Sequence, residues 1–147
     1  MANLTSWIGG TIGYVSGAID RDAIASDYAA KTYTEMGLVK TIGALGDTSN
    51  SISVSLLKEG RATKVNGEKD GGEISMAVAF DASDSTYTAI RALANTNTNV
   101  WFKVTDADAK IVYFQGLVAN WQETERNNTT EKGATFVVRN NVGYVYV

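Results

Sequence analysis

Residues 71–95 read GGEISMAVAFDASDSTYTAIRALAN, and within them the spacing of the apolar residues changes once. In 73–80 every second residue is large and apolar: Ile74, Met76, Val78 and Phe80. This alternation predicts a β-strand with one buried face. In 84–95 the apolar residues are three and four positions apart, which predicts an amphipathic helix of about three turns. The stretch therefore favours a sheet with a helix packed against it.

The alternation of 73–80 recurs on both sides of this stretch. Further strands are predicted over 51–57, 100–105, 110–124 and 134–147. Gly116 lies inside one of the longer runs, where a glycine can mark a β-bulge. Residues 36–147 are thus expected to form one mainly β domain, a β-sandwich or barrel of about seven strands with one flanking helix at 84–95.

Residues 1–35 differ in composition from the rest of the chain. They contain four glycines, many alanines and three closely spaced aspartates, and they show no clear hydrophobic period. A short helical turn is expected near 22–30. Because such a segment buries little apolar surface by itself, we expect an extended N-terminal arm that is either mobile or docked on another surface.

The composition limits the chemistry that the 147-residue chain can perform. It contains no cysteine and no histidine, which excludes Cys–His and Ser–His–Asp catalysis. The 13 basic and 16 acidic residues give a net charge of −3, whereas proteins that bind nucleic acid through its phosphates are usually basic. No apolar run approaches the roughly 18 residues of a membrane span. We therefore expect no enzyme, no cofactor or metal, no specific DNA binding and no membrane partner.

Two pairs of residues offer alternatives to a purely structural role. Asp106 and Asp108 could form a carboxylate pair, but they separate two predicted strands and are better explained as a hairpin turn. Trp101 and Trp121 could stack on a sugar ring, although aromatic residues on half-buried strands usually belong to a core or an interface. A carbohydrate-binding module and an enzyme that uses carboxylates alone thus stay open as alternative functions.

A polar stretch, KEGRATKVNGEKDGG at 58–72, separates two of the predicted strands. It is long for a connection within a domain, and long loops are usually functional or disordered. Part of it can form a hairpin, with 62–65 as a strand and Asn66-Gly67 as the turn. The stretch is then either a solvated hairpin tip or a contact arm that reaches a neighbouring subunit. Its candidate self-assembly residues are Arg61, Lys64, Asn66, Glu68, Lys69 and Asp70.

The second face of the predicted strand 73–80 is made of small residues. Ser75, Ala77 and Ala79 would allow another surface to approach the strand closely. A close contact between subunits is one explanation of this face. A crowded barrel interior is the other.

The order of these segments is similar to that of a known family. GGEISMAVAFDASD leads into the helix YTAIRALAN, and VWFKVTD, an acidic turn and IVYFQGLVANW follow. The chain resembles the tail-tube (major tail) proteins of long-tailed phages, which are related to the tube subunit of type VI secretion systems. The resemblance covers roughly 36–145 and rests mainly on 72–81 and 114–118, while residues 1–35 match poorly.

The resemblance implies a particular assembly. Copies of the chain would form hexameric rings with sheets that continue around a lumen, and the rings would stack into a tube that conducts DNA during infection. Ser75, Ala77 and Ala79 would contribute ring contacts. The 58–72 loop and the N-terminal arm would bridge subunits and adjacent rings, with the loop giving stacking contacts.

The same resemblance implies partners and a location. The partners would be other copies of the chain together with the tape measure, tail tip and terminator proteins, and DNA would pass through without specific binding. The protein would belong to the virion tail and would be assembled in the cytoplasm of the host bacterium. The alternative function is a carbohydrate-binding or virion decoration module of the same β class.

Overall fold

The computed structural model describes residues 8–37, 39–58, 60–80 and 85–147. Most of the described residues lie in strands. In chain order the elements are β1 (Thr11–Ser16), α1 (Ala25–Ala29), β2 (Thr34–Glu35), β3 (Val39–Ile42), β4 (Thr48–Leu56), β5 (Arg61–Asp70), β6 (Glu73–Ala79), α2 (Ser85–Leu93), β7 (Asn99–Thr105), β8 (Ile111–Glu123) and β9 (Gly133–Tyr146).

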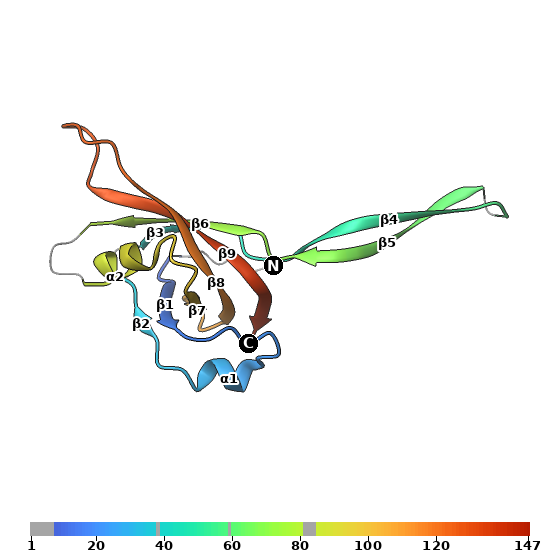
Figure 1. The fold of residues 1–147 in the computed structure, drawn as a ribbon, viewed down its shortest axis with the longest axis horizontal. Coiled ribbons are helices and arrows are strands. Elements are labelled where there is room, and N and C mark those ends of the chain that lie inside the picture. Colours follow the sequence, from blue (N-terminus) through green and yellow to red (C-terminus); the bar gives the residue numbers. More distant parts are fainter. Residues whose placement is uncertain (1–7, 38, 59, 81–84) are drawn as a thin grey trace, which may run out of the picture.

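Two sheets of very different size make up the molecule. The larger has seven strands in the order β2-β1-β7-β8-β9-β6-β3, with every pairing antiparallel. It curls into a half-barrel, which we call the body (Figure 1). The smaller sheet is the β4–β5 hairpin, which projects from the body as a long extension and which we call the arm. The mainly β class predicted from the sequence is confirmed, with a half-barrel as its architecture.

The hydrophobic core lies on the concave side of the half-barrel. Cross-strand partners meet there, such as Phe102 and Phe114, whose rings stack with centroids 5.1 Å apart. Helix α2 covers part of this side and inserts Tyr87 and Ile90, which are 5% and 1% exposed. The predicted flanking helix is thus present, and its first described residue is Ser85; Asp84 lies outside the described residues. Burial of these large side chains is the main stabilising contribution to the body.

The strand predicted over 73–80 is confirmed by β6. Ile74, Met76 and Val78 are buried in the core, and the residues between them point to the opposite side of the sheet. Gly116 marks a bulge, as predicted, because the pairing of β8 with β9 shifts register between Phe114 and Gly116. A Cβ on Gly116 would lie 2.5 Å from the carbonyl oxygen of Arg139, so only glycine fits this close approach of the two strands.

The segment before residue 35 is attached to the body along most of its described length. β1 pairs with β7 over all six of its residues and lies inside the large sheet, between β2 and β7. The sheet therefore contains residues from both sides of the boundary that the sequence placed near 35. The helical turn expected near 22–30 is present as α1, and its Tyr28 is fully buried.

Candidate assembly surfaces

The 58–72 stretch is not the loop that the sequence predicts. Residues 61–70 are β5, which pairs with β4 as far as Leu56 and Arg61, so the chain does not reverse at Asn66-Gly67. The strand pattern of 51–57 continues upstream to Thr48, so the two strands are nearly equal in length. At about 3.4 Å per residue, the nine residues of β4 extend roughly 30 Å. Tertiary pairing decided the structure here, since β5 contains few residues that favour strands.

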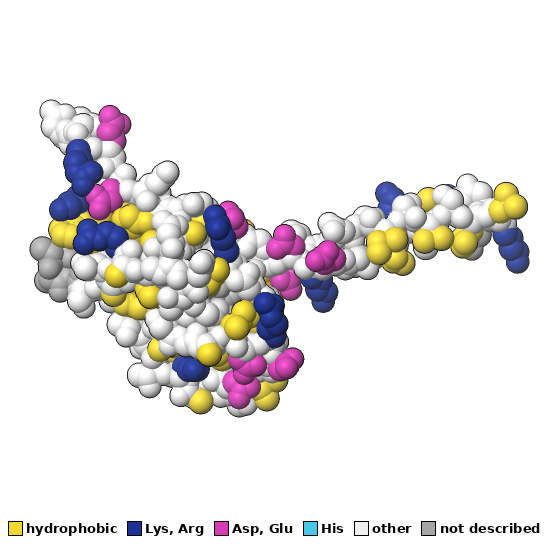
Figure 2. All heavy atoms as spheres, viewed as in Figure 1, with side chains coloured by type: hydrophobic (Ala, Val, Ile, Leu, Met, Phe, Trp, Pro, Cys, Tyr) yellow, Lys and Arg dark blue, Asp and Glu magenta, His cyan; other side chains and the backbone are white. Residues whose placement is uncertain are grey.

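One face of the arm is apolar and open to solvent. The register places Ile52 opposite Val65, Val54 opposite Thr63 and Leu56 opposite Arg61. The four large apolar residues on this face form what we call the arm stripe: Ile52, Val54, Leu56 and Val65, which are 50%, 47%, 44% and 51% exposed. Figure 2 shows hydrophobic side chains in a row along one side of the projecting hairpin.

The other face of the arm is polar. Ser51, Ser53 and Ser55 lie opposite Asn66, Lys64 and Ala62, respectively. An amphipathic two-stranded hairpin is at best marginally stable in water, because its apolar face has nothing to pack against. Among the described residues, no second layer covers the apolar face of the arm.

The six candidate self-assembly residues are spread over both faces and the full length of β5. Arg61 lies at the tip of the arm on the face of the stripe, opposite Leu56, whereas Lys64 and Asn66 lie on the polar face. Near the body, Lys69 pairs with Ser49 and Asp70 with Thr48, and Glu68 lies where the register shifts. The structure does not bring the six together into one cluster. The sequence does not predict the stripe as an exposed surface, although the alternation in 51–57 indicates an apolar face on this strand.

The three candidate ring-contact residues share one face, as predicted from their spacing. Ser75, Ala77 and Ala79 point away from the core, so they do not line a barrel interior. Their cross-strand partners on β9 are Val137, Thr135 and Gly133. Ser75 is exposed on this outer face, whereas Ala77 and Ala79 are partly buried.

A cavity of about 950 Å³ opens between the two ends of the half-barrel. Residues of β1, β2, β3 and the 43–45 segment line it, together with parts of β7, β8 and β9. We call this opening the seam. Its apolar lining residues include Ile12, Val39, Ile42, Leu45, Val112 and Tyr146. The sequence does not predict the seam, because the seam depends on how far the sheet curls.

The N-terminal segment is fastened to the outer face of the sheet by one buried glutamine. The side-chain oxygen of Gln115 accepts hydrogen bonds from the backbone N–H of Asp20 and from Nδ2 of Asn99, both at 3.1 Å. Its Nε2 donates to the Asp20 carbonyl and to the Tyr28 hydroxyl, both at 2.9 Å. Gln115 is 0% exposed, and the bulge leaves it without a partner residue in the pairing with β9. Three of these four hydrogen bonds thus hold the docked segment, and the fourth joins Gln115 to Asn99 of β7.

Aromatic rings complete this attachment. Tyr28 packs between Trp101 and Tyr113, with ring centroids 4.8 and 5.1 Å away. Burial raises the pKa of the Tyr28 hydroxyl, although the hydrogen bond from Gln115 opposes the shift. Burial also raises the pKa of Tyr33, whose hydroxyl donates to the Tyr28 carbonyl. Trp101 is 3% exposed and therefore offers no platform for a sugar.

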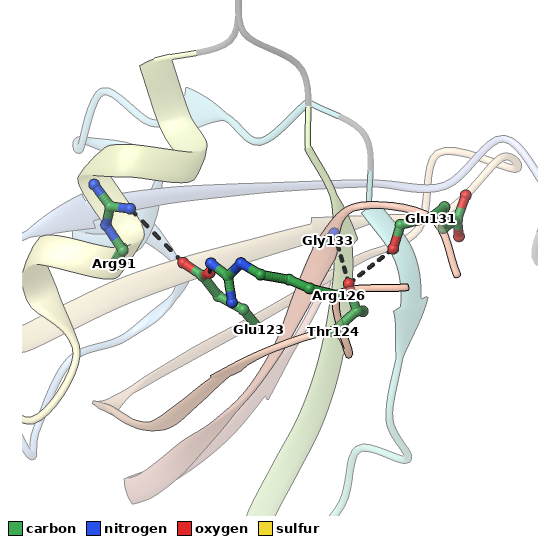
Figure 3. A network of polar contacts seen from close by, with 6 residues as sticks. All are labelled: Arg91, Glu123, Thr124, Arg126, Glu131 and Gly133. Atoms are coloured by element: carbon green, nitrogen blue, oxygen red, sulfur yellow. Dashed lines mark hydrogen bonds and ion pairs between the residues drawn. The ribbon is translucent and has the colours of Figure 1, made fainter. Parts of the chain in front are cut away.

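A polar network stabilises the base of the loop between β8 and β9 (Figure 3). Glu123 forms ion pairs with Arg91 of α2, at 3.8 Å, and with Arg126. The Thr124 hydroxyl donates to the Glu131 carbonyl at 2.7 Å and accepts from the Gly133 N–H at 3.2 Å. The contacts of Thr124 join the two ends of the loop, so the network positions the loop.

The remaining candidates from the sequence have structural explanations. Asp106 and Asp108 form the predicted hairpin turn, in which the Asp106 N–H donates to the Lys110 carbonyl and the Lys110 N–H donates to Oδ1 of Asp108. Trp121 packs against Tyr87 and Phe136. Among the described residues, no three acidic side chains gather as a metal site would require.

Comparisons with known proteins agree on one family and one fold. The family model described as "Phage tail tube protein, TTP" matches residues 22–146. A chain of the anti-feeding prophage baseplate, solved by cryo-EM with six-fold symmetry, has 10% sequence identity and a TM-score of 0.71; the alignment covers 100% of this chain and 97% of that one. No curated protein matches the sequence.

A second solved structure shows the same fold. A chain of the cap that terminates the anti-feeding prophage tube has 8% identity and a TM-score of 0.62, with 100% of this chain and 94% of that one covered. At such low identities the likeness concerns the fold alone. In the part of the chain that the structure describes, no helix has the length and apolar character needed to span a bilayer.

Proposed function

Because this chain belongs to the phage tail tube protein family, we propose that its copies form hexameric rings that stack into the tube of a virion tail. Membership of the family makes the chain a structural component of such a tail, a role that requires no catalysis. The finished tube would conduct DNA to the host cell. Assembly would take place in the cytoplasm of the host bacterium.

The observation that carries the proposal is the arm stripe. Its four side chains are about half exposed in the single chain, and full burial of such a side chain contributes about 1.5–3 kcal/mol. Covering the stripe would therefore contribute roughly 3–6 kcal/mol per arm. Since every copy has one arm, each arm would bridge to a neighbouring copy, which is a heterologous contact that closes into a ring or continues as a filament.

The other surfaces fit the same assembly. The outer face of β6, with Ser75, Ala77 and Ala79, would provide ring contacts, and the arm would provide contacts between adjacent rings. The six-fold symmetry of the anti-feeding prophage baseplate, which contains a chain of this fold, supports six as the number of subunits. Tape measure, tail tip and terminator proteins would be the other partners of the tube.

The net charge of the chain is compatible with a tube that does not bind the DNA passing through it. The chain carries a net charge of −3, and a bore lined by basic residues would bind phosphates and slow the passage of DNA. We therefore propose that DNA passes through without specific binding. A carbohydrate-binding or virion decoration module is a weaker alternative, because Trp101 is buried and Trp121 is partly buried against Tyr87 and Phe136.

Negative-stain electron microscopy tests the proposal directly. The purified protein should form rings or hollow tubes as its concentration rises. A matched variant would replace residues 50–68 with an Asn-Gly turn, which keeps the pairing of Thr48 with Asp70 at the base of the arm. Circular dichroism should show that this variant is folded, and microscopy should show no stacked tubes. Normal tubes from the armless variant would contradict the assigned role of the arm.

A further inference from the structure

Within the described residues, the half-barrel is open along the seam. β2 and β3 are the two end strands of the sheet, and within the described residues β2 pairs only with β1 and β3 only with β6. Both strands thus expose one edge of unpaired backbone groups, which is a ready template for pairing with another chain. The cavity between these edges is mostly apolar in its lining, and Tyr146 at its rim is 65% exposed.

The arm stripe cannot fill the seam of its own chain. The arm projects away from the body with the stripe along one of its sides (Figures 1 and 2), and no residue of β4 or β5 is among those that line the cavity. A second copy, however, brings an arm with no such constraint. The arm stripe and the seam are therefore two apolar surfaces that can contact each other only between two copies of the chain.

The charges on the two surfaces are complementary. Arg61 lies beside the stripe at the tip of the arm, whereas Glu35 and Asp106 line the cavity. Among the described residues, none of these three side chains forms an ion pair. Opposite charges at the rim of an apolar contact would select the orientation of the arm more than they would add affinity.

We propose that the seam between β2 and β3 is the acceptor site for the arm of a second copy. The stripe would enter the cavity, and a strand of the arm would lie along the free edge of β3 or β2, which closes the half-barrel. This inference rests on the proposed function, because it names the surface that receives the arm in the tube. It also explains why two features with open apolar surface persist in one chain.

Disulfide cross-linking tests the acceptor site, and the absence of native cysteine gives a clean background. Protein with Val54→Cys in the stripe would be mixed with protein carrying Leu45→Cys in the seam, under mild oxidation. We expect the mixed disulfide to form at least tenfold faster than with the control donor Ser53→Cys, which places the thiol on the polar face of the same strand. Tyr146→Cys serves as a second acceptor if Leu45→Cys impairs folding.

The outcomes separate the acceptor site from the proposed function. Sedimentation velocity of the same mixtures reports whether the chain assembles. If the chain assembles but Val54→Cys forms the mixed disulfide no faster than Ser53→Cys, the seam is not the acceptor site, while the proposed role in a tube is unaffected. Cross-links only between two seam thiols, or only between two arm thiols, also overturn it. If the mixtures neither assemble nor cross-link at high concentration, the seam and the arm-mediated assembly both fail.

Discussion

The body and the arm use the same alternating pattern with opposite results. In β6 the alternation buries Ile74 and Met76 to 1% and 2% exposure, whereas in β4 it leaves Ile52 and Val54 at 50% and 47%. The difference is the second layer: β6 faces the interior of a curled seven-stranded sheet, and β4 has only one partner strand. The alternation of apolar and polar residues thus predicts that a strand has an apolar face, but it does not predict whether that face is buried within the same chain.

The largest effect is expected when the body loses a core side chain. Phe114→Ala should lower the free energy of unfolding by about 3–5 kcal/mol, because Phe114 is fully buried against Phe102. Val54→Ala, the matched deletion in the arm, should cost the single chain less than about 1 kcal/mol. Urea denaturation at a concentration where the protein is monomeric measures both. Equal costs would show that the arm is packed like the body.

A smaller loss is expected at the attachment of the N-terminal segment. Gln115→Ala should destabilise the protein by about 1–3 kcal/mol, since it leaves the buried Tyr28 hydroxyl and the Asp20 backbone without their partner. Hydrogen exchange should rise over 17–31 more than elsewhere. The exposed Gln122, on the same strand, provides the control variant Gln122→Ala. If hydrogen exchange became faster to the same extent throughout the protein, Gln115 would not be specific to the attachment of the N-terminal segment.

The body should also respond to alkaline pH in a way that the arm does not. Burial raises the pKa values of Tyr28 and Tyr33 above the usual value of 10.0. The folded state then keeps protons that the unfolded state releases, so stability is full below about pH 10 and falls as the pH rises beyond it. Tyr33→Phe should make this fall shallower. Denaturation curves across that range test the sign, and a rise in stability would contradict it.

The smallest effect is expected from the exposed charge at the tip of the arm. Arg61→Glu should weaken assembly by about two- to fivefold, because an exposed ion pair contributes roughly 0.2–1 kcal/mol. The loss should shrink at high salt, where exposed charges are screened. Adding Glu35→Arg to the same chain should restore part of the affinity if the two positions meet. Sedimentation equilibrium at two salt concentrations measures these differences.

The features that the sequence predicted are those set by short-range patterns. The strand at Ile74–Val78, the helix over 85–93, the turn at Asp106 and the bulge at Gly116 each follow from the spacing or the identity of a few neighbouring residues. The tail-tube family was also identified from the sequence, through the order of these segments, and the family comparison agrees.

The features that the sequence did not predict depend on contacts between distant residues. β5 forms because β4 pairs with it and not because its own residues favour a strand, so the sequence predicts a turn at Asn66-Gly67, within the observed strand. Nothing in the sequence distinguishes Gln115 from an exposed polar residue, because its role depends on the docking of Asp20 and Tyr28 against it. The seam is visible only once the sheet has curled.

The claim at the centre of this account is that the arm stripe is covered by a neighbouring copy. Sedimentation velocity of the wild-type chain beside the double variant Ile52→Ser/Val65→Ser tests it most directly, because this cross-strand pair contributes two of the four side chains of the stripe. We predict concentration-dependent oligomers for the wild type, and monomers with an unchanged unfolding transition for the variant. Oligomers of the same size and affinity in both proteins would contradict the claim.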